Sequence, residues 1–193
     1  MTRLSWIAVS FLLVGCASSP SNGYYTLSVE SPCPATAPLP DIDGLGRTTV
    51  RLPGMLDRPQ LVVRSGPQTL DIREFDRWAE PLDQMTNRVL AEDIARCQSP
   101  AASGKLRYAL SVSVDEFMAD TSGQAYLTGR WWIVEEGEKS VNPGHSFSLR
   151  ERVDQARGAE RAAAMSVLLG RLAGEIVRWS SLSENSVPAR PST

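Results

Sequence analysis

Residues 106–115 carry the sequence feature that most restricts the fold of this chain. The stretch reads LRYALSVSVD, with an apolar side chain at every second position. Because successive side chains of a β-strand point to opposite faces, this alternation predicts a strand with one buried face and one polar face. It is the clearest strand in the chain, and the fold must bury one of its faces.

Six further segments have the composition of strands. They are residues 24–29, 48–52, 61–64, 69–73, 125–135 and 145–152. Residues 69–73 alternate apolar and polar side chains and are expected at an edge of the sheet. Residues 125–135 are long and contain two adjacent tryptophans, so a central strand covered on both faces is expected there.

Two segments predict amphipathic helices, because their apolar side chains recur at helical spacing. The first starts at Pro81, where a missing N–H costs nothing, and the second spans residues 158 to about 180. The apolar side chains of the first are Leu82, Met85, Val89, Leu90, Ile94 and Cys97. Those of the second are Ala162, Met165, Leu168, Leu169, Leu172, Ala173, Ile176 and Trp179.

These elements predict a single α/β domain with a mixed sheet of about five to seven strands and two main helices. The helices exclude a helix-poor sandwich. The absence of a Gly-rich turn between a strand and a helix excludes a Rossmann fold.

The N-terminus has the form of a bacterial lipoprotein signal. Arg3 precedes an apolar run, residues 4–14, that reaches about 16 Å as a helix, roughly half the hydrocarbon thickness of a bilayer. The run ends in LVGC, which resembles the lipobox, where cleavage before Cys16 leaves a cysteine carrying diacylglycerol and an N-acyl chain. An ordinary signal peptide with an incidental cysteine is the alternative.

The chain is therefore divided into four parts. Residues 1–15 are expected to be the signal peptide, 16–23 the lipidated cysteine and a flexible tether, 24–182 the folded domain and 183–193 a disordered tail. Two or more acyl chains hold a protein stably at a membrane. In similar lipoproteins an Asp directly after the lipidated cysteine retains the protein at the inner membrane. Ala17 therefore favours the outer membrane, and the domain is expected on its periplasmic face.

The charge and the cysteine content of the chain bear on whether it binds nucleic acid, forms a disulfide or binds a metal. The chain has 20 Lys and Arg against 22 Asp and Glu, without a basic cluster, so binding of nucleic acid has no support. Cys33 and Cys97 can form a disulfide in an oxidising periplasm, and two independent cysteines are the alternative. No metal site is expected, because neither cysteine lies in a Cys-x-x-Cys pair or near His145.

Catalytic chemistry finds little support in the sequence. His145 is the only histidine, and no Gly-x-Ser-x-Gly elbow marks a nucleophile. Asp76 and Glu80 are a candidate carboxylate pair for glycoside hydrolysis, but acidic residues near the start of a helix are more simply explained by the helix dipole. The sequence therefore favours a protein without catalytic residues or cofactor, apart from the covalent lipid.

Two segments, residues 52–64 and 74–82, combine turns, charges and aromatic side chains in an unusual way. One explanation is a local lock, with Phe75 and Trp78 packed over the start of the helix and nearby arginines paired with carboxylates. The other is a surface that contacts a partner. The candidate contact residues are Arg58, Arg64, Arg77, Trp78 and Glu80.

The same two segments resemble a known family. LPxxLDRPQLVVR followed by EFDRWAEPLxxxxxRVLAEDIA, with YYTL after the tether and AYLTGRWWIVEE further on, is similar to the ABC-type transport auxiliary lipoproteins. The resemblance covers roughly residues 22–181. It implies a single three-layer α/β domain in the periplasm.

The resemblance also implies a function and partners. Such a protein takes part in moving lipids or other hydrophobic molecules between the inner and outer membranes. Its partners are a periplasm-spanning protein with MCE domains and an inner-membrane permease. The lipoprotein would dock the outer end of the MCE tube, with a homo-oligomeric ring as one arrangement.

Two other functions remain open at the level of sequence. The domain itself could carry lipid as a periplasmic chaperone, which requires an apolar pocket of several hundred Å³. A periplasmic hydrolase that uses His145 is the third and least supported function.

Overall fold

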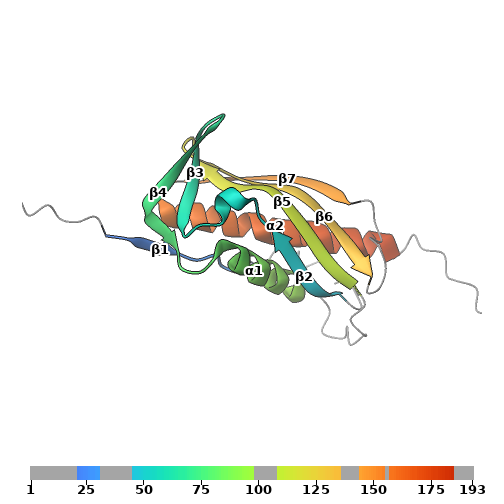
Figure 1. Cartoon of the computed structure of the whole chain (residues 1–193). Helices are drawn as coiled ribbons and strands as arrows, with labels where there is room; N and C mark the ends of the chain where they lie inside the picture. The colour runs from blue at the N-terminus through green and yellow to red at the C-terminus, as the bar shows by residue number, and fades with distance from the viewer. Residues whose placement is uncertain (1–20, 31–44, 98–107, 136–143, 155–156, 185–193) are drawn as a thin grey trace, which may run out of the picture.

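The computed structural model describes residues 21–30, 45–97, 108–135, 144–154 and 157–184. Seven strands and two α-helices fill these ranges, with one short 3₁₀ helix (Figure 1). The strands are β1 (Gly23–Tyr25), β2 (Leu45–Arg51), β3 (Gln60–Gly66), β4 (Thr69–Trp78), β5 (Tyr108–Asp120), β6 (Gln124–Glu135) and β7 (His145–Arg152). The helices are η1 (Gly54–Leu56), α1 (Leu82–Arg96) and α2 (Gly158–Glu184).

All seven strands belong to one mixed sheet. Its main order is β1-β4-β3-β5-β6-β7, and β2 pairs with β5 off this path. The β3–β4, β5–β6 and β6–β7 pairs are antiparallel, as expected of strands joined by tight connections. The pairs β1–β4, β2–β5 and β3–β5 are parallel. The predicted α/β class with a mixed sheet and two main helices is confirmed.

Strands β2 and β3 lie on the same side of β5, one after the other. β2 pairs with Tyr108–Ser113, and β3 pairs with Ala119 and Asp120. Between them, residues 52–59 leave the sheet, form η1 and return. The chain thus interrupts one row of the sheet in the segment that the sequence analysis singles out.

The two helices lie side by side on one face of the sheet (Figure 1). Sheet and helices therefore form two layers instead of the three that the resemblance leads us to expect. The other face of β7 carries exposed side chains at Ser146, Ser148 and Arg150, so water covers it there. Here β7 pairs with β6 in antiparallel orientation, and an antiparallel strand can be apolar on one side and face water on the other.

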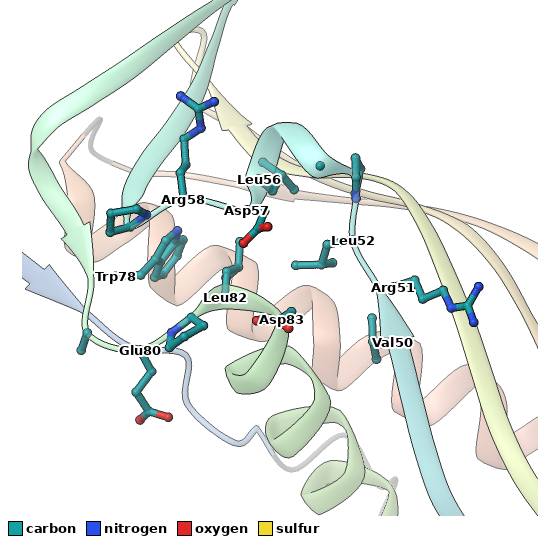
Figure 2. Close-up of a pocket in the computed structure, with 15 residues that line it drawn as sticks. Val50, Arg51, Leu52, Leu56, Asp57, Arg58, Trp78, Glu80, Leu82 and Asp83 are labelled. Carbon is teal, nitrogen blue, oxygen red and sulfur yellow. The ribbon is translucent and has the colours of Figure 1, made fainter.

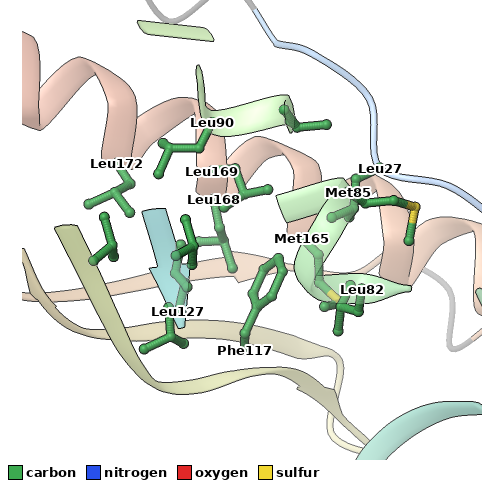
Figure 3. Packing of buried hydrophobic residues seen from close by; sticks show 14 of the residues in the cluster. Leu27, Leu82, Met85, Leu90, Phe117, Leu127, Met165, Leu168, Leu169 and Leu172 are labelled. Carbon is green, nitrogen blue, oxygen red and sulfur yellow. The ribbon is translucent and has the colours of Figure 1, made fainter. Parts of the chain in front are cut away.

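The core lies between this face and the helices (Figure 3). Phe117 of β5 points toward α2, where it meets side chains that include Met165 and Leu168. The apolar positions predicted for both helices are buried, with Trp179 partly so. In β5, Leu110, Val112 and Val114 are buried as the alternation predicts.

The expectation that residues 125–135 are covered on both faces is wrong. Trp131 is 3% exposed on the helix side, whereas Trp132 is only partly buried and points the other way. Adjacent residues of a strand face opposite sides, so two consecutive tryptophans reveal only that one of them is inside.

Element boundaries differ from the predictions at several ends. β1 is shorter than residues 24–29, β4 continues to Trp78, and α2 extends to Glu184. α1 begins at Leu82, because Pro81 takes an extended ψ of 130° and caps the helix from outside. In the described part of the chain, no helix is long and apolar enough to cross a bilayer.

Several sequence predictions fall outside the described residues. They are the signal peptide 1–15, the lipid-bearing Cys16, most of the tether and residues 185–193 of the predicted tail. Cys97 directly follows α1 and is 1% exposed. Cys33 is not among the described residues, so the Cys33–Cys97 pairing stays a prediction.

Candidate functional site

The two unusual segments of the sequence come together around one cleft (Figure 2). Its volume is about 680 Å³, and three parts of the chain line it: the end of β2, the excursion 52–59 and the corner from β4 into α1. The lining residues are Val50, Arg51, Leu52, Pro53, Gly54, Leu56, Asp57, Arg58, Pro59, Trp78, Ala79, Glu80, Pro81, Leu82 and Asp83. We call this hollow the motif cleft.

The first wall of the motif cleft is a tight turn held by its own backbone. The N–H of Leu56 donates to the carbonyl of Pro53 (2.9 Å), and the N–H of Asp57 donates to that of Gly54 (3.2 Å). The Arg58 side chain donates from Nε to the carbonyl of Met55 (3.0 Å). Pro53 restricts the backbone at the entry. The wall is therefore rigid although it lies outside the sheet.

The second wall is the corner between β4 and α1. The N–H of Trp78 donates to the carbonyl of Pro59 (2.8 Å), which ties this corner to the first wall. The N–H of Ala79 donates to the carbonyl of Tyr25 in β1, also at 2.8 Å. Pro81 then ends the extended backbone, and its carbonyl accepts the first helical hydrogen bond from Met85.

The floor of the motif cleft is apolar and its rim is charged. Buried floor residues are Val50, Leu56, Trp78 and Leu82, each 4–5% exposed. Rim residues are Arg51, Asp57, Arg58, Glu80 and Asp83, all of them exposed or partly exposed. Both signs of charge occur on the rim, so the cleft suits a polypeptide segment that offers an apolar side chain and its own mixed charges.

α1 is attached to the cleft by one amide side chain. Oδ1 of Asn87 accepts from the N–H of Val50 (2.7 Å), and its Nδ2 donates to the Val50 carbonyl (3.3 Å). The side chain thus takes the place of a neighbouring strand at the edge of β2. This double hydrogen bond fixes the distance between the β2 wall and the helix that carries Leu82 and Asp83.

The structure brings three of the five candidate contact residues together. Arg58, Trp78 and Glu80 line the motif cleft, and Glu80 also pairs with Arg88 of α1 (3.4 Å). Arg64 and Arg77 do not line it. Arg64 forms an ion pair with Glu116 (2.7 Å), and Arg77 forms one with Glu74 (3.2 Å).

The local-lock explanation holds only in part. Trp78 is buried beside Leu82 at the start of α1, and Arg77 pairs with a carboxylate, as that explanation expects. Phe75, however, is 48% exposed, and Arg58 bonds a backbone carbonyl instead of a carboxylate. A local lock therefore does not explain why the ring of Phe75 is exposed or why charged residues form the rim of the motif cleft.

Further residues of the rim, Arg51, Asp57 and Asp83, were not named as candidates from the sequence. The signal that could have found them is their position: Asp57 lies inside the first unusual segment, Arg51 directly precedes it, and Asp83 directly follows the second.

The candidate catalytic residues have structural partners. The ring of His145 stacks on Trp131 (4.5 Å between centroids) and lies 4.6 Å from the ring of Trp179. Ser146, the next residue in β7, points to the opposite face. Oδ1 of Asp76 accepts from the hydroxyl of Tyr25 (2.9 Å), and Glu80 pairs with Arg88. Both carboxylates of the candidate pair therefore have structural partners.

Comparison with known proteins identifies relatives by sequence and by fold. The family ABC-type transport auxiliary lipoprotein component matches residues 25–177. No curated protein matches the chain at a significant level. The crystal structure of protein XCC0632 from Xanthomonas campestris superposes with a TM-score of 0.68 at 19% identity, covering 84% of this chain and 96% of that one. An uncharacterized protein gives 0.66 at 18%, covering 83% and 99%. At sequence identities this low, the two superpositions show a shared fold and nothing about function.

Proposed function

Because the chain belongs to the ABC-type transport auxiliary lipoprotein family, we propose that it is the docking subunit of an MCE-type system for lipid transport between membranes. As a member of a lipoprotein family, it is anchored to a membrane. The finer proposal is that Cys16 carries the lipid and that the anchor lies in the periplasmic face of the outer membrane. The partners are an MCE-domain protein that spans the periplasm and the inner-membrane permease behind it.

The single observation that carries this proposal is that the two unusual segments line one cleft. Residues 52–59 and 78–83 flank the β3–β4 hairpin, and the bond from the N–H of Trp78 to the carbonyl of Pro59 holds them together at its base. Residues 52–59 and 79–83 lie outside the strands, so pairing of the sheet does not require their composition. A binding surface explains why unusual residues gather there.

The chemistry of the cleft favours a protein partner over a reaction. Its floor is apolar, its walls are rigid, and its charged residues occupy the rim, as in an interface with an apolar centre and a polar border. The candidates for catalysis have structural partners, and of these only Glu80 lies on the rim of the cleft, where it pairs with Arg88. We therefore propose a role without catalysis, in which the cleft receives a segment of the MCE-domain protein.

Charge reversal on the rim tests the docking role. In membranes that carry the transport system, Arg58→Glu combined with Glu80→Lys is expected to lower recovery of the MCE-domain protein with this lipoprotein by about tenfold. Arg152→Glu, an exposed change at the end of β7, is the matched control and is expected to leave recovery unchanged. Equal recovery with all three forms would refute docking at this cleft.

The volume of the motif cleft supports a second candidate function, that of a lipid carrier. A pocket of about 680 Å³ falls in the range of small-molecule sites. Mass spectrometry of the purified domain without its anchor distinguishes the two functions. Reproducible co-purification of lipid, lost when Leu56→Asp is introduced into the floor, would favour the carrier over the docking subunit.

A further inference from the structure

Four exposed apolar side chains gather on two neighbouring strands. Five large apolar residues are exposed in the described part of the chain, and four of them lie on β1 and β4. These are Tyr24 (64% exposed), Leu70 (39%), Ile72 (45%) and Phe75 (48%). Isolated exposed apolar residues need no explanation, but a group on adjacent strands marks an interaction surface. We call this group the β1–β4 patch.

Leu70 and Ile72 point away from the helices. Val63 of β3 pairs with Ala119, which shares its face with Phe117, and Phe117 points to α2 (Figure 3). The neighbours of Val63 along β3 therefore face away from α2. Ile72 pairs with one neighbour, Val62, and Leu70 pairs with the other, Arg64. Paired residues share a face, so both apolar side chains lie on the outer side of the sheet.

Tyr24 and Phe75 lie on the same side as Leu70 and Ile72. The hydroxyl of Tyr25 donates to Asp76, and the ring of Tyr25 lies against Gly158 at the start of α2. Tyr25 and Asp76 thus face the helices. Tyr24 and Phe75, each one residue earlier in its strand, face the opposite way. A register shift of β4 against β3 between Arg73 and Arg77 interrupts the alternation, which is why Ile72 and Asp76 face opposite sides. All four apolar side chains belong to one outer surface.

This outer surface also has an open strand edge. β1 pairs only with Asp76–Trp78 of β4, and β3 occupies the other side of β4. Among the described strands, none covers residues 69–75 on the side of β1. The β3–β4 hairpin projects at the end of the molecule where β1 lies, whereas α2 runs toward the other end (Figure 1).

The charges beside the β1–β4 patch are largely neutralised by close partners. Arg77, which pairs with Tyr24 across the strands, forms an ion pair with Glu74. Arg64, which pairs with Leu70, forms one with Glu116. The patch therefore offers apolar and aromatic contact with little net attraction for either sign of charge.

The length of chain before β1 limits how far this patch can lie from a lipid anchor on Cys16. Seven residue steps separate Cys16 from Gly23, the first residue of β1, and an extended chain of that length spans at most about 24 Å. A lipid on Cys16 therefore keeps β1 within that distance of the bilayer. We propose that the β1–β4 patch lies against the phospholipid surface and orients the domain on it. This inference rests on the lipid anchor of the proposed function.

A tethered surface needs only weak affinity to remain bound. Attachment by a short linker gives an effective local concentration in the millimolar range, so a few apolar side chains are enough to select one orientation. Tyrosine and other amphipathic rings are favoured at the level of lipid headgroups. Because the neighbouring charges are paired, the contact is expected to depend little on anionic lipid or on salt.

Photolabelling of the lipidated full-length protein tests the inference. The protein is placed in vesicles of phosphatidylethanolamine and phosphatidylglycerol that contain a tracer phospholipid with a diazirine group, and labelled peptides are mapped by mass spectrometry. Labelling is expected at Tyr24 and at residues 70–75, and not on β7. The double variant Ile72→Ser, Phe75→Ser is expected to reduce labelling of β4 about fivefold.

Met55→Ser is the matched control, because it removes an apolar side chain of similar exposure (40%) outside the two strands. It is expected to leave labelling of β4 unchanged. Labelling spread evenly over the domain, or no labelling of β4 above that of β7, would overturn the inference. So would an intact mass without lipid on Cys16. The vesicles contain no MCE-domain protein, so a failure of docking leaves this readout unaffected.

Discussion

Asp93 is the only acidic residue buried in the described part of the chain. Asp93 lies in α1 and is 0% exposed. Among the described residues, no donor meets the geometry of a hydrogen bond to either carboxylate oxygen. Burial raises the pKa of Asp93 from 3.8 to about 7; the backbone of Glu30 lowers it in part, and the carboxylate of Glu30 raises it further. The positive charge of Arg96 lowers the pKa of Asp93, and the negative charge of Glu92 raises it.

This pKa makes the stability of the domain depend on pH. Below pH 4, Asp93 is protonated in both the folded and the unfolded chain. Between pH 4 and 7 Asp93 ionises first in the unfolded chain, so its contribution to the free energy of unfolding falls as pH rises and levels off above pH 7. We expect Asp93→Asn to gain about 2–4 kcal/mol over the natural chain at pH 8 and almost nothing at pH 4.

Denaturant unfolding at both pH values measures this difference. Asp115→Asn is the control, because Asp115 is exposed in β5 and the same substitution there should show no such difference between the two pH values. An Asp93→Asn variant whose gain is equal at pH 4 and pH 8 would contradict the raised pKa.

Trp78 connects the stability of the domain with the shape of the motif cleft. Its ring is 5% exposed, and its backbone ties the two walls together. Trp78→Ala is expected to lower the free energy of unfolding by about 3–5 kcal/mol through loss of buried contacts. Trp132→Ala, a partly exposed site on the other face, should cost clearly less. A Trp78→Ala protein that melts normally but loses its partner would instead identify Trp78 as a contact residue.

At the scale of elements, β5 and β6 depend on a close approach at Gly129. β5 has a register shift between Val114 and Glu116 opposite this glycine. A Cβ at position 129 would overlap the carbonyl oxygen of Ser113 and lie 2.9 Å from the ring of Phe147. The backbone of β5 cannot retreat without disturbing the core beneath it.

Gly129→Ala is therefore expected to destabilise the domain by about 3 kcal/mol or more, measured by denaturant unfolding. Gly54→Ala in η1 is the matched control, because nothing lies within 4 Å of its Cβ position. Equal stability of the two variants would contradict the close packing of β5 against β6.

Single elements were predictable where their periodicity extended over many residues. The positions of β7, α1 and most of β5 and β6 agree with those predicted from alternation or helical spacing. One buried face requires an apolar side chain at every second residue of a strand and at every third or fourth residue of a helix. β1 and β4 were less accurately bounded. β4 carries apolar residues on its exposed outer face, so its pattern does not separate inside from outside.

At the scale of the whole molecule, the sequence predicted the class of fold but not the pairing of distant strands. β1 pairs with β4 across some fifty residues, and β2 and β3 share one side of β5. Neither arrangement leaves a local signal. For this reason the sequence singled out the segments of the motif cleft but could not show that they meet, nor that Arg64 and Arg77 lie apart from it.

The Cys33–Cys97 disulfide is a prediction at this largest scale. Cross-linking the two would close a loop of about 65 residues, which in the chain-entropy model stabilises the domain by roughly 4 kcal/mol. We expect alkylation of the denatured, unreduced protein to leave both cysteines unmodified, and Cys33→Ser to lower the stability accordingly. Modification of both cysteines before reduction would show that they are independent.

The excursion between β2 and β3 has an evolutionary consequence. Because β2 and β3 are separately hydrogen-bonded to β5, residues 52–59 can change in length and composition without shifting the register of either strand. Residues 52–59 read LPGMLDRP and carry the LPxxLDRP motif that resembles the family, so relatives that share the motif are expected to share this turn. A change in the length of the excursion is expected to alter recognition at the motif cleft while the scaffold still folds.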